Sequence, residues 1–274
     1  MQIDARKFKE EGFVIIRDVF SEKEIDGLRE TVDETLLQDL QTDKAYLYKD
    51  KTKDVYYTIG DLLSKPLSKL LLDDRVIKIA TEILGAEPTY FGESNYQVGI
   101  GDRGFHRDGV DRIYPIGPDW EDGYKIIRMG IYLQSHDNTS GGLKVQVGSN
   151  QKAQGKKIIL DLKAGDVVVW DLRTYHSGNA VRLKILPNLP LGYRLENMLP
   201  SFLIKNSPDT RMSCFIVFGV ENKHLHRHIE KHHKLKNPKH IQVSNWTEEA
   251  VDLLKSKGVN IIDPKLDLLF SNNK

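Results

Sequence analysis

The chain has 274 residues, of which 39% are hydrophobic and 29% charged, and its 40 Lys and Arg residues against 39 Asp and Glu residues give a formal net charge of +1. This is the composition of a globular protein, and it excludes a membrane span, because no window holds the roughly 18 uninterrupted apolar residues that a span needs. Cys214 is the only cysteine, which excludes an internal disulfide and a cysteine-based zinc site. A metal would have to be held by histidine and carboxylate.

The N-terminal residues MQIDARKFKEEGF lack the basic and then apolar layout of a secretion signal. We therefore expect a cytoplasmic protein. The balanced charge gives no reason to expect a nucleic-acid partner. The oligomeric state cannot be read from the sequence, and the length fits either two small domains or one large β-rich domain.

Two helical regions are predicted before the first strongly β-like segment. Ser21 and Glu24 have the spacing of a capping box, and the apolar residues that follow recur at helical spacing, which predicts a helix over about residues 21–40 that packs on a sheet. Residues 63–85 read LSKPLSKLLLDDRVIKIATEILG. They predict a second helical stretch, which Gly85 would end.

From Thr89 onward the sequence changes to short runs of β-branched and aromatic residues that are separated by turn residues. These runs cover residues 89–100, 124–134, 142–148, 156–162, 166–172 and 212–220. No helical segments alternate with them as a parallel sheet would require. The pattern predicts an α+β protein whose antiparallel sheets form a sandwich or barrel.

The segment 223–240, KHLHRHIEKHHKLKNPKH, carries six of the nine histidines, and six lysine or arginine residues against one glutamate give it a local net charge of +5. We interpret it as a basic, helical and solvated appendix. His224, His228 and His232 would share one helical face, but we assign no metal to them. Attraction to an anionic lipid, a nucleic acid or an acidic substrate is the alternative. Residues 246–263 resemble one more amphipathic helix.

The residues that carry the strongest chemical signal are His106 and Asp108. Residues two apart on a strand point to the same face, so an imidazole and a carboxylate would lie side by side. His176 follows the run 166–172 and could be brought opposite this pair. Two histidines and one carboxylate leave three positions of an octahedral metal open, as in non-haem Fe(II) oxygenases. A single buried histidine with a hydrogen bond would explain the first motif equally well.

Further motifs follow in a fixed order. They are SGGLKVQVGSN at 140–150, GDVVVWD at 165–171 and HSGN at 176–179, and a glycine-led helix entry at 12–29 precedes them. With these motifs the sequence resembles the phytanoyl-CoA dioxygenase family of Fe(II)- and 2-oxoglutarate-dependent oxygenases over about residues 10–220. It departs from the family pattern at Val147 and Asn150, where the family hairpin usually carries proline and histidine.

The resemblance implies a double-stranded β-helix, a jelly-roll or cupin-like barrel with flanking N-terminal helices, in which His106, Asp108 and His176 hold Fe(II). The oxygenase domain would cover residues 1–220 with a long insertion at 177–210. Residues 221–274 would form a His- and Lys-rich helical extension packed on, or trailing from, the same domain.

The family also implies an arginine beyond the second histidine that binds the far carboxylate of 2-oxoglutarate. The candidates are Arg211, which would share a strand face with Ser213, and Arg182, which lies in an irregular stretch only six residues after His176. We favour Arg211. Gln97, on the strand before His106, is expected to line the same cavity.

The implied activity is hydroxylation or desaturation of a small molecule by O2, with release of succinate and CO2. Related halogenases replace the iron-binding carboxylate by a small residue, so Asp108 argues against chlorination. Tyr193, Arg194 and Lys184 on the insertion are candidate contacts to a polar or anionic substrate, whose identity the sequence does not give. Two alternatives use the same fold: a metal-dependent, non-oxidative isomerase or hydrolase, and a non-catalytic binding protein.

Overall fold

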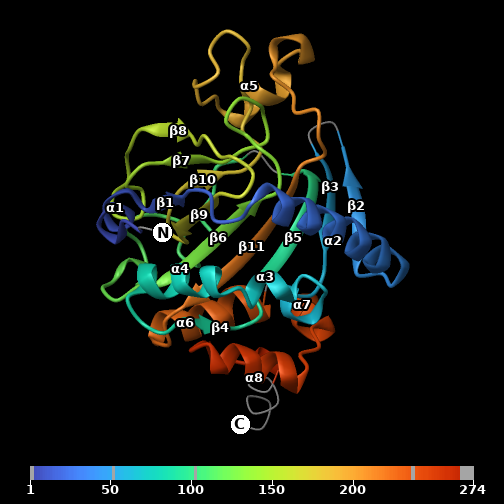
Figure 1. The fold of residues 1–274 in the computed structure, drawn as a ribbon. Helices are drawn as coiled ribbons and strands as arrows, with labels where there is room; N and C mark the ends of the chain where they lie inside the picture. The colour runs from blue at the N-terminus through green and yellow to red at the C-terminus, as the bar shows by residue number, and fades with distance from the viewer. Residues whose placement is uncertain (1–2, 51–52, 102–103, 236–237, 266–274) are drawn as a thin grey trace.

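The computed structural model describes residues 3–50, 53–101, 104–235 and 238–265 (Figure 1). Two β-sheets face each other. The larger sheet has nine strands, and its main path runs β1 (Phe13–Ile16), β9 (Val167–Asp171), β6 (Ile126–Tyr132), β11 (Met212–Gly219), β5 (Ser94–Ile100), β3 (Asp54–Thr58) and β2 (Ala45–Lys49). The smaller sheet has the order β10 (His176–Ser177), β7 (Lys144–Gln146) and β8 (Lys157–Ile159). The antiparallel pairing along both paths agrees with the predicted α+β class.

Alternation along the strands of the large sheet gives it two different faces. One face contributes Phe13, Tyr132, Val168 and Trp170 to a buried cluster that Leu143 and Val145 of the smaller sheet complete. The space between the sheets therefore holds a packed apolar core, and Tyr132, Leu143 and Trp170 of this core also line a cavity. The opposite face lies against helices and shares their larger core.

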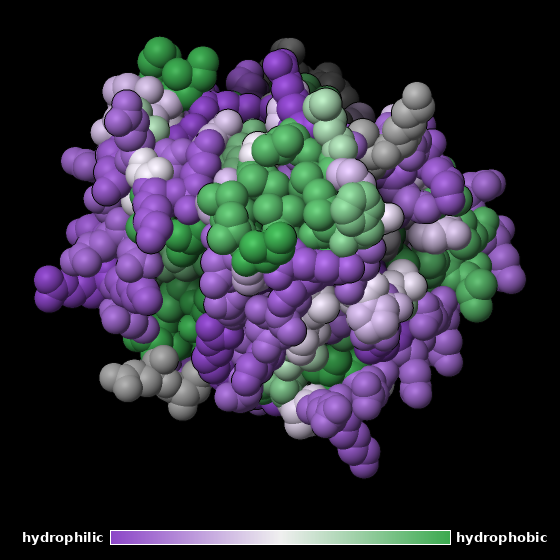
Figure 2. All heavy atoms as spheres, turned by 90° about the horizontal axis from the view of Figure 1, so that it is seen from above, coloured by the Kyte–Doolittle hydropathy of each residue, from purple (hydrophilic) through white to green (hydrophobic). Residues whose placement is uncertain are grey.

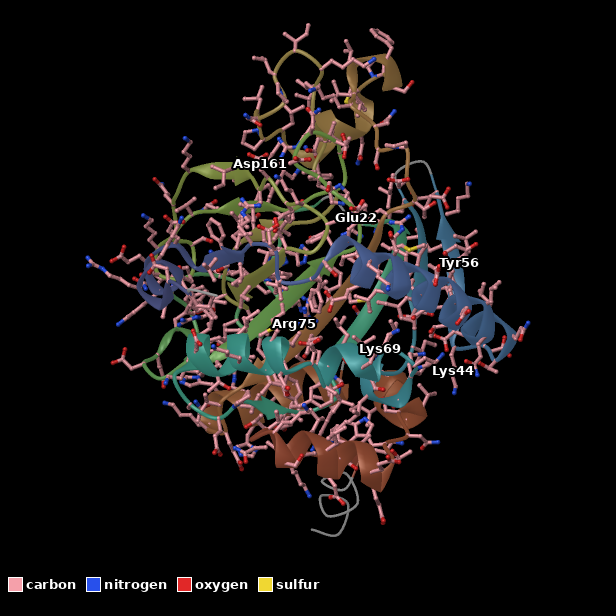
Figure 3. The ribbon with its side chains drawn as sticks, viewed as in Figure 1. Glu22, Lys44, Tyr56, Lys69, Arg75 and Asp161 are labelled. Atoms are coloured by element: carbon pink, nitrogen blue, oxygen red, sulfur yellow. The ribbon has the colours of Figure 1, made fainter. Side chains whose placement is uncertain are left out.

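Helices α2 (Glu22–Gln41), α3 (Ser68–Leu71) and α4 (Asp74–Leu84) cover that second face (Figure 1). The capping box that was predicted at Ser21 is formed, and Gly85 ends α4 in the left-handed conformation with φ +63°. Arg75 of α4, labelled in Figure 3, ties the two long helices together by donating to Glu24 at 2.6 Å.

The second predicted helix is not continuous. It is broken into a 3-10 turn at Leu62–Ser64, α3 and α4. The break before α4 has a local cause, because the Asp73 side chain accepts a hydrogen bond from the Arg75 backbone N–H and starts a new helix. The hairpin of β2 and β3 is a further element, which the sequence patterns did not indicate.

The remaining short helices lie outside the two sheets. They are α1 (Ala5–Glu11), a 3-10 turn at Pro118–Trp120, α5 (Tyr193–Met198) and a 3-10 turn at Ser201–Leu203. The described part of the chain holds no helix long and apolar enough to span a membrane.

Helix α5 belongs to the long connection between β10 and β11, at the top of the view in Figure 1. It is anchored by a fully buried ion pair in which the Lys144 Nζ lies 2.7 Å from the Glu196 carboxylate. The connection also exposes large apolar side chains, including Ile185 (83% exposed), Met198 (79%) and Phe202 (68%). Figure 2, seen from this side, shows a compact apolar patch.

The C-terminal segment comprises α6 (Lys223–His228), a π-helical turn at Ile229–Lys234, α7 (Pro238–Val243), α8 (Glu248–Ser256) and β12 (Asn260–Ile261), which pairs with β4 (Thr89–Tyr90). The prediction that its histidines are solvated holds for His226, which is 56% exposed, and is wrong for three others. His224, His228 and His233 are at most 2% exposed. Leu225 and Ile229 pack into an apolar cluster with Phe91 and draw the helical turns that carry these histidines against the sheet.

Candidate metal and co-substrate site

His106 and His176 are held opposite each other by the backbone. The His106 N–H donates to the His176 carbonyl at 2.8 Å, and the His176 N–H donates to the His106 carbonyl at 2.9 Å, which forms an isolated antiparallel bridge. Directly opposite residues of such a bridge point to the same side. The two imidazole rings accordingly lie with their centroids 4.5 Å apart.

Hydrogen bonding also fixes the orientation of each ring. The Nδ1 of His106 lies 2.9 Å from the Gly104 carbonyl, and the Nδ1 of His176 lies 2.9 Å from the Thr174 carbonyl. A carbonyl only accepts, so each Nδ1 carries a proton, and the Nε2 atoms are the ones that face the site where a metal would bind. The two Nε2 atoms lie 3.5 Å and 3.4 Å from the Asp108 carboxylate oxygens. Three metal-binding atoms therefore converge on one point.

The charge of Asp108 is also stabilised by Arg128 and Trp170. Its Oδ2 accepts from Arg128 Nη1 at 2.9 Å and from the indole Nε1 of Trp170 at 3.3 Å. Burial by itself would raise the pKa of the Asp108 carboxyl, but the neighbouring Arg128 and histidines outweigh it, and this pKa lies well below its ordinary value. Burial lowers the pKa of His176 to about 4. Both groups are thus in the protonation state that binds a metal.

Strand register places Arg128 and Trp170 beside Asp108. Arg128 of β6 lies directly opposite Trp170 of β9, so both side chains point to the cavity side of the sheet. Gly130 follows Arg128 on the same face, and a Cβ there would lie 3.0 Å from a Trp170 ring atom. Glycine at this position leaves the indole the room that it needs to reach Asp108.

The second half of the site lies on neighbouring strands. The Arg211 guanidinium is 5% exposed; its Nε donates to the Gly141 carbonyl at 2.9 Å and its Nη1 to Gln97 Oε1 at 2.8 Å. Ser213 lies between Gln97 of β5 and Tyr132 of β6 in the strand register. Among the described residues its buried hydroxyl has no hydrogen-bond partner. An unpaired buried hydroxyl beside a buried cation is typical of a site that receives a ligand.

His106, His176, Gln97, Tyr132 and Arg211 line one cavity of about 220 Å³. The structure therefore brings the sequence-predicted metal ligands together with the favoured arginine, and it places Ser213 on the same sheet face. Arg182 lies elsewhere: its guanidinium donates to the His136 and Leu160 carbonyls and pairs with Asp161, and it is not among the lining residues of this cavity.

A larger cavity of about 660 Å³ adjoins the first one, because Tyr57, Asn95, Arg128 and Phe215 line both. Its far side is built by residues of the C-terminal segment, among them His232 and His233. Sequence reasoning missed this side and also missed Glu93, which binds Arg128 Nη2 at 2.5 Å. One signal was present, because Glu93, Asn95 and Gln97 alternate along one segment.

The fold of the chain resembles solved structures of known enzymes. The non-haem α-ketoglutarate-dependent carbocyclase SnoK from nogalamycin biosynthesis superposes with a TM-score of 0.55 at 18% identity, covering 81% of this chain and 88% of SnoK. HygX from Streptomyces hygroscopicus, with nickel and 2-oxoglutarate bound, gives 0.53 at 13% identity, covering 80% and 88%. EctD from S. alaskensis, with 2-oxoglutarate and 5-hydroxyectoine, gives 0.50 at 16% identity, covering 79% and 74%.

These likenesses confirm the predicted double-stranded β-helix with its flanking helices. A search of curated protein sequences found no significant match. The sequence profile described as phytanoyl-CoA dioxygenase, in contrast, matches residues 8–182, which are more than half of the chain and include the two histidines and Asp108. The chain therefore belongs to the phytanoyl-CoA dioxygenase family, a family of Fe(II)- and 2-oxoglutarate-dependent oxygenases.

Proposed function

We propose that this protein is an Fe(II)- and 2-oxoglutarate-dependent dioxygenase that hydroxylates or desaturates a small polar or anionic molecule. The observation that carries the proposal is the convergence of His106, Asp108 and His176 beside a cavity that also contains Arg211. Two imidazole nitrogens and one ionised carboxylate fit Fe(II) and would leave three of its positions open. The unpartnered Ser213 hydroxyl supports a carboxylate ligand near Tyr132, its neighbour in the strand register, which lines the cavity.

Arg211 would hold the far carboxylate of 2-oxoglutarate, with Ser213 donating a second hydrogen bond. The bonds from Arg211 to Gly141 and Gln97 fix the plane of the guanidinium before the ligand arrives. Arg128 and Trp170 would keep Asp108 ionised and oriented. Iron(II) with 2-oxoglutarate and O2 supplies the oxidising chemistry for a C–H bond, while the protein positions that bond.

The adjoining cavity of about 660 Å³ would hold the molecule to be oxidised. Its volume is within the range of sites for small organic ligands. It meets the metal-site cavity at Asn95, Arg128 and Phe215, so a bound molecule would present one end to His106 and His176. Tyr193, Arg194 and Lys184, the substrate contacts that were suggested on the insertion, are not among the lining residues of either cavity.

The decisive experiment is an anaerobic titration of Fe(II) and 2-oxoglutarate into metal-free protein, followed by the visible charge-transfer band that forms when both bind one centre. We expect the band in the wild type and in Arg182→Lys. In Arg211→Ala we expect the 2-oxoglutarate affinity to fall at least about a hundredfold, because a buried charge-assisted pair is lost. A normal band in Arg211→Ala would move the assignment to Arg182.

The same titration separates the alternatives. Bound iron without a band would favour a non-oxidative metal-dependent isomerase or hydrolase on this fold. A protein that binds no iron would contradict the assignment of His106, Asp108 and His176. Band formation without consumption of 2-oxoglutarate in the presence of any candidate substrate would favour a binding role.

A further inference from the structure

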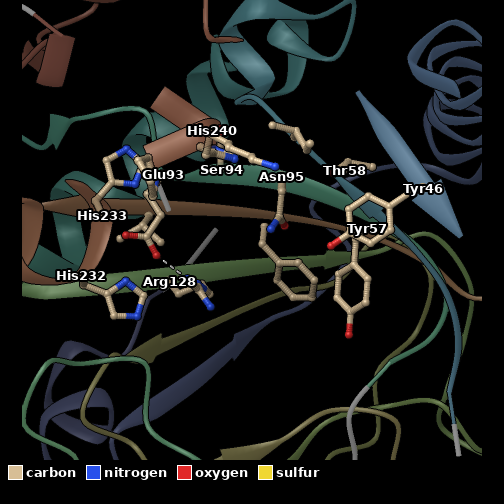
Figure 4. A pocket seen from close by; sticks show the side chains of 15 residues that line it. Tyr46, Tyr57, Thr58, Glu93, Ser94, Asn95, Arg128, His232, His233 and His240 are labelled. Atoms are coloured by element: carbon tan, nitrogen blue, oxygen red, sulfur yellow. Dashed lines mark hydrogen bonds and ion pairs between the residues drawn. The ribbon is translucent and has the colours of Figure 1, made fainter. Parts of the chain in front are cut away.

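The larger cavity has two chemically different ends, as Figure 4 shows. Tyr46 and Tyr57 line one side, and Glu93, Arg128, His232 and His233 gather on the other. Arg128 also lines the metal-site cavity. A molecule in the larger cavity would therefore meet a polar wall built partly by the C-terminal segment.

This wall contains buried polar groups with no partner. His233 is 1% exposed, and within the described part of the chain neither of its ring nitrogens makes a hydrogen bond. The Nδ1 of His232 and the Nε of Arg128 are also buried and also lack a hydrogen-bond partner among these residues. Buried polar groups are nearly always paired, and a cluster of unpaired ones around one cavity indicates a ligand that supplies their partners.

The charges around the cavity favour an anionic partner. Its lining holds two cations, of which Arg128 is already paired with Glu93 and Asp108, so Lys239 is the cation left for a ligand. Glu93 is already bound by Arg128 at 2.5 Å and by His228 Nε2 at 2.6 Å, so it neutralises no further group. Lys239 has no carboxylate partner among the described residues and lines the cavity beside His240. Unpaired donors thus outnumber unpaired acceptors in this wall.

The histidines contribute as neutral donors. Burial lowers the pKa of both His232 and His233 to about 4, so near neutral pH each ring carries a single N–H and no charge. A neutral imidazole can donate to an oxyanion without the cost of burying another charge. The positive charge would then come from Lys239, and the Nε of Arg128 would add a hydrogen-bond donor.

We propose that His233, His232 and Lys239 form the subsite for an oxyanion head group, a phosphate, phosphonate or carboxylate, of the molecule that is oxidised. The inference rests on the proposed function and extends it by naming the end of the substrate that this protein recognises. The head group would lie at the wall formed by the C-terminal segment. The reacting carbon would lie at the shared border of the two cavities, near His106.

The same cluster could suggest a second metal, since ligand atoms of Glu93, His228 and His232 lie within 4.8 Å of one another. Two contacts argue against it. His228 Nε2 donates a 2.6 Å hydrogen bond to the Glu93 carboxylate, and a metal would have to displace that proton. Arg128 places a guanidinium 2.5 Å from the same carboxylate. A cation would be repelled where an oxyanion would be attracted.

The test is a calorimetric titration of inorganic phosphate, and separately of acetate, into protein that already holds Fe(II) and 2-oxoglutarate under anaerobic conditions. The bound 2-oxoglutarate keeps Arg211 occupied. We expect phosphate to bind the wild type, and Lys239→Met and His233→Phe each to weaken its affinity about tenfold, because each removes one charge-assisted or buried hydrogen bond. Stronger binding of acetate than of phosphate would identify a carboxylate head group.

Lys231→Met is the matched control, because Lys231 belongs to the same segment, is half exposed and does not line the cavity. It should leave the phosphate affinity unchanged. None of the three variants, Lys239→Met, His233→Phe and Lys231→Met, should alter the charge-transfer band. A wild-type protein without the band would contradict the proposed function, whereas the phosphate titration tests the oxyanion subsite. Equal binding by Lys239→Met and Lys231→Met, no phosphate or acetate binding by the wild type, or a second equivalent of bound metal would overturn the oxyanion subsite.

Discussion

Individual side chains around the metal site differ in whether their hydrogen bonds are already made. Arg211 is fixed by Gly141 and Gln97, and Asp108 by Arg128 and Trp170. Ser213, two residues after Arg211 on the same strand face, is the exception because its hydroxyl has no partner within the described residues. The hydrogen bonds of Arg211 and Asp108 contribute to stability and orientation, whereas under the proposed function Ser213 would gain its partner from 2-oxoglutarate.

Ser213→Ala should therefore separate ligand affinity from stability. Removal of a hydroxyl that lacks a partner should change the free energy of unfolding of the metal-free protein by less than about 0.5 kcal/mol. The affinity for 2-oxoglutarate should fall about fivefold to tenfold, because one hydrogen bond to a carboxylate is lost. Urea unfolding and the anaerobic titration measure the two quantities.

Ser201→Ala is the control for this pair of measurements, since Ser201 is an exposed serine on the long connection. It should alter neither quantity. A clear loss of stability in Ser213→Ala without a change in 2-oxoglutarate affinity would assign Ser213 a purely structural role.

The residues of the candidate site also differ in how well the sequence predicts their position. The candidate metal ligands were predictable because their motifs occur in order along the chain, but the predicted strand is not formed at these residues, since His106 forms an isolated bridge and Asp108 lies in a bend. The sequence already favours Arg211 over Arg182, and the structure supports this choice because Arg182 is occupied by His136, Leu160 and Asp161.

Among the elements, α2 and α4 show how local sequence signals become tertiary contacts. Glu24 closes the capping box by accepting from the Ser21 N–H at 2.8 Å, and the same carboxylate accepts from Arg75 of α4 at 2.6 Å. The capping box was visible in the sequence. The contact with Arg75 of α4 was not visible, because the sequence predicts one helical stretch over residues 63–85 without showing how it packs against α2.

Glu24→Gln should lower the free energy of unfolding by about 1 kcal/mol at pH 7, a value kept small because the carboxylate is 43% exposed. Hydrogen bonding to Arg75, then to Ser21, lowers the pKa of Glu24 from 4.5 to about 2. A depressed pKa in the folded state contributes stability above the unfolded pKa, and this contribution disappears as the pH falls towards the folded pKa. The difference between wild type and variant should thus shrink between about pH 4.5 and pH 2.

Chemical unfolding at several pH values measures this difference. Glu34→Gln on the exposed side of α2 is the control and should stay within about 0.5 kcal/mol of the wild type at every pH. A stability difference in Glu24→Gln that persists unchanged at pH 2 would contradict the assigned role of the carboxylate.

Across the whole molecule, several contacts hold the C-terminal segment against the sheet and the helices. Trp246 donates its indole N–H to both oxygens of Asp61 at 3.0 Å, and Asp61 is fully buried. β12 adds to the edge strand β4, and His228 binds Glu93. Residues 223–240 suggested a solvated appendix because most of them are charged residues or histidines. Their burial depends instead on a few apolar residues, such as Leu225 and Ile229, which face the sheet.

Trp246→Phe keeps an aromatic ring beside Tyr90 but removes the donor to a buried carboxylate, so it should lower the free energy of unfolding by about 1–3 kcal/mol. We expect a single unfolding transition in both proteins, because the segment shares buried contacts with the sheet. Differential scanning calorimetry measures this. Asn245→Ala, an exposed neighbour, should change stability by less than about 0.5 kcal/mol, and an early, separate transition in Trp246→Phe would show that the segment unfolds independently.

The backbone bridge between His106 and His176 has a consequence for which metal the protein carries. Because the two histidines are aligned by the peptide chain itself, their ordering is completed when the chain folds and needs no ion. Such a preformed pair of imidazoles with a carboxylate accepts any borderline divalent ion, and affinity rises from Mn²⁺ through Fe²⁺, Co²⁺ and Ni²⁺ to Cu²⁺. The backbone alone would therefore discriminate little among these ions, and occupancy of the proposed site by Fe(II) would depend on the metals available when the protein folds.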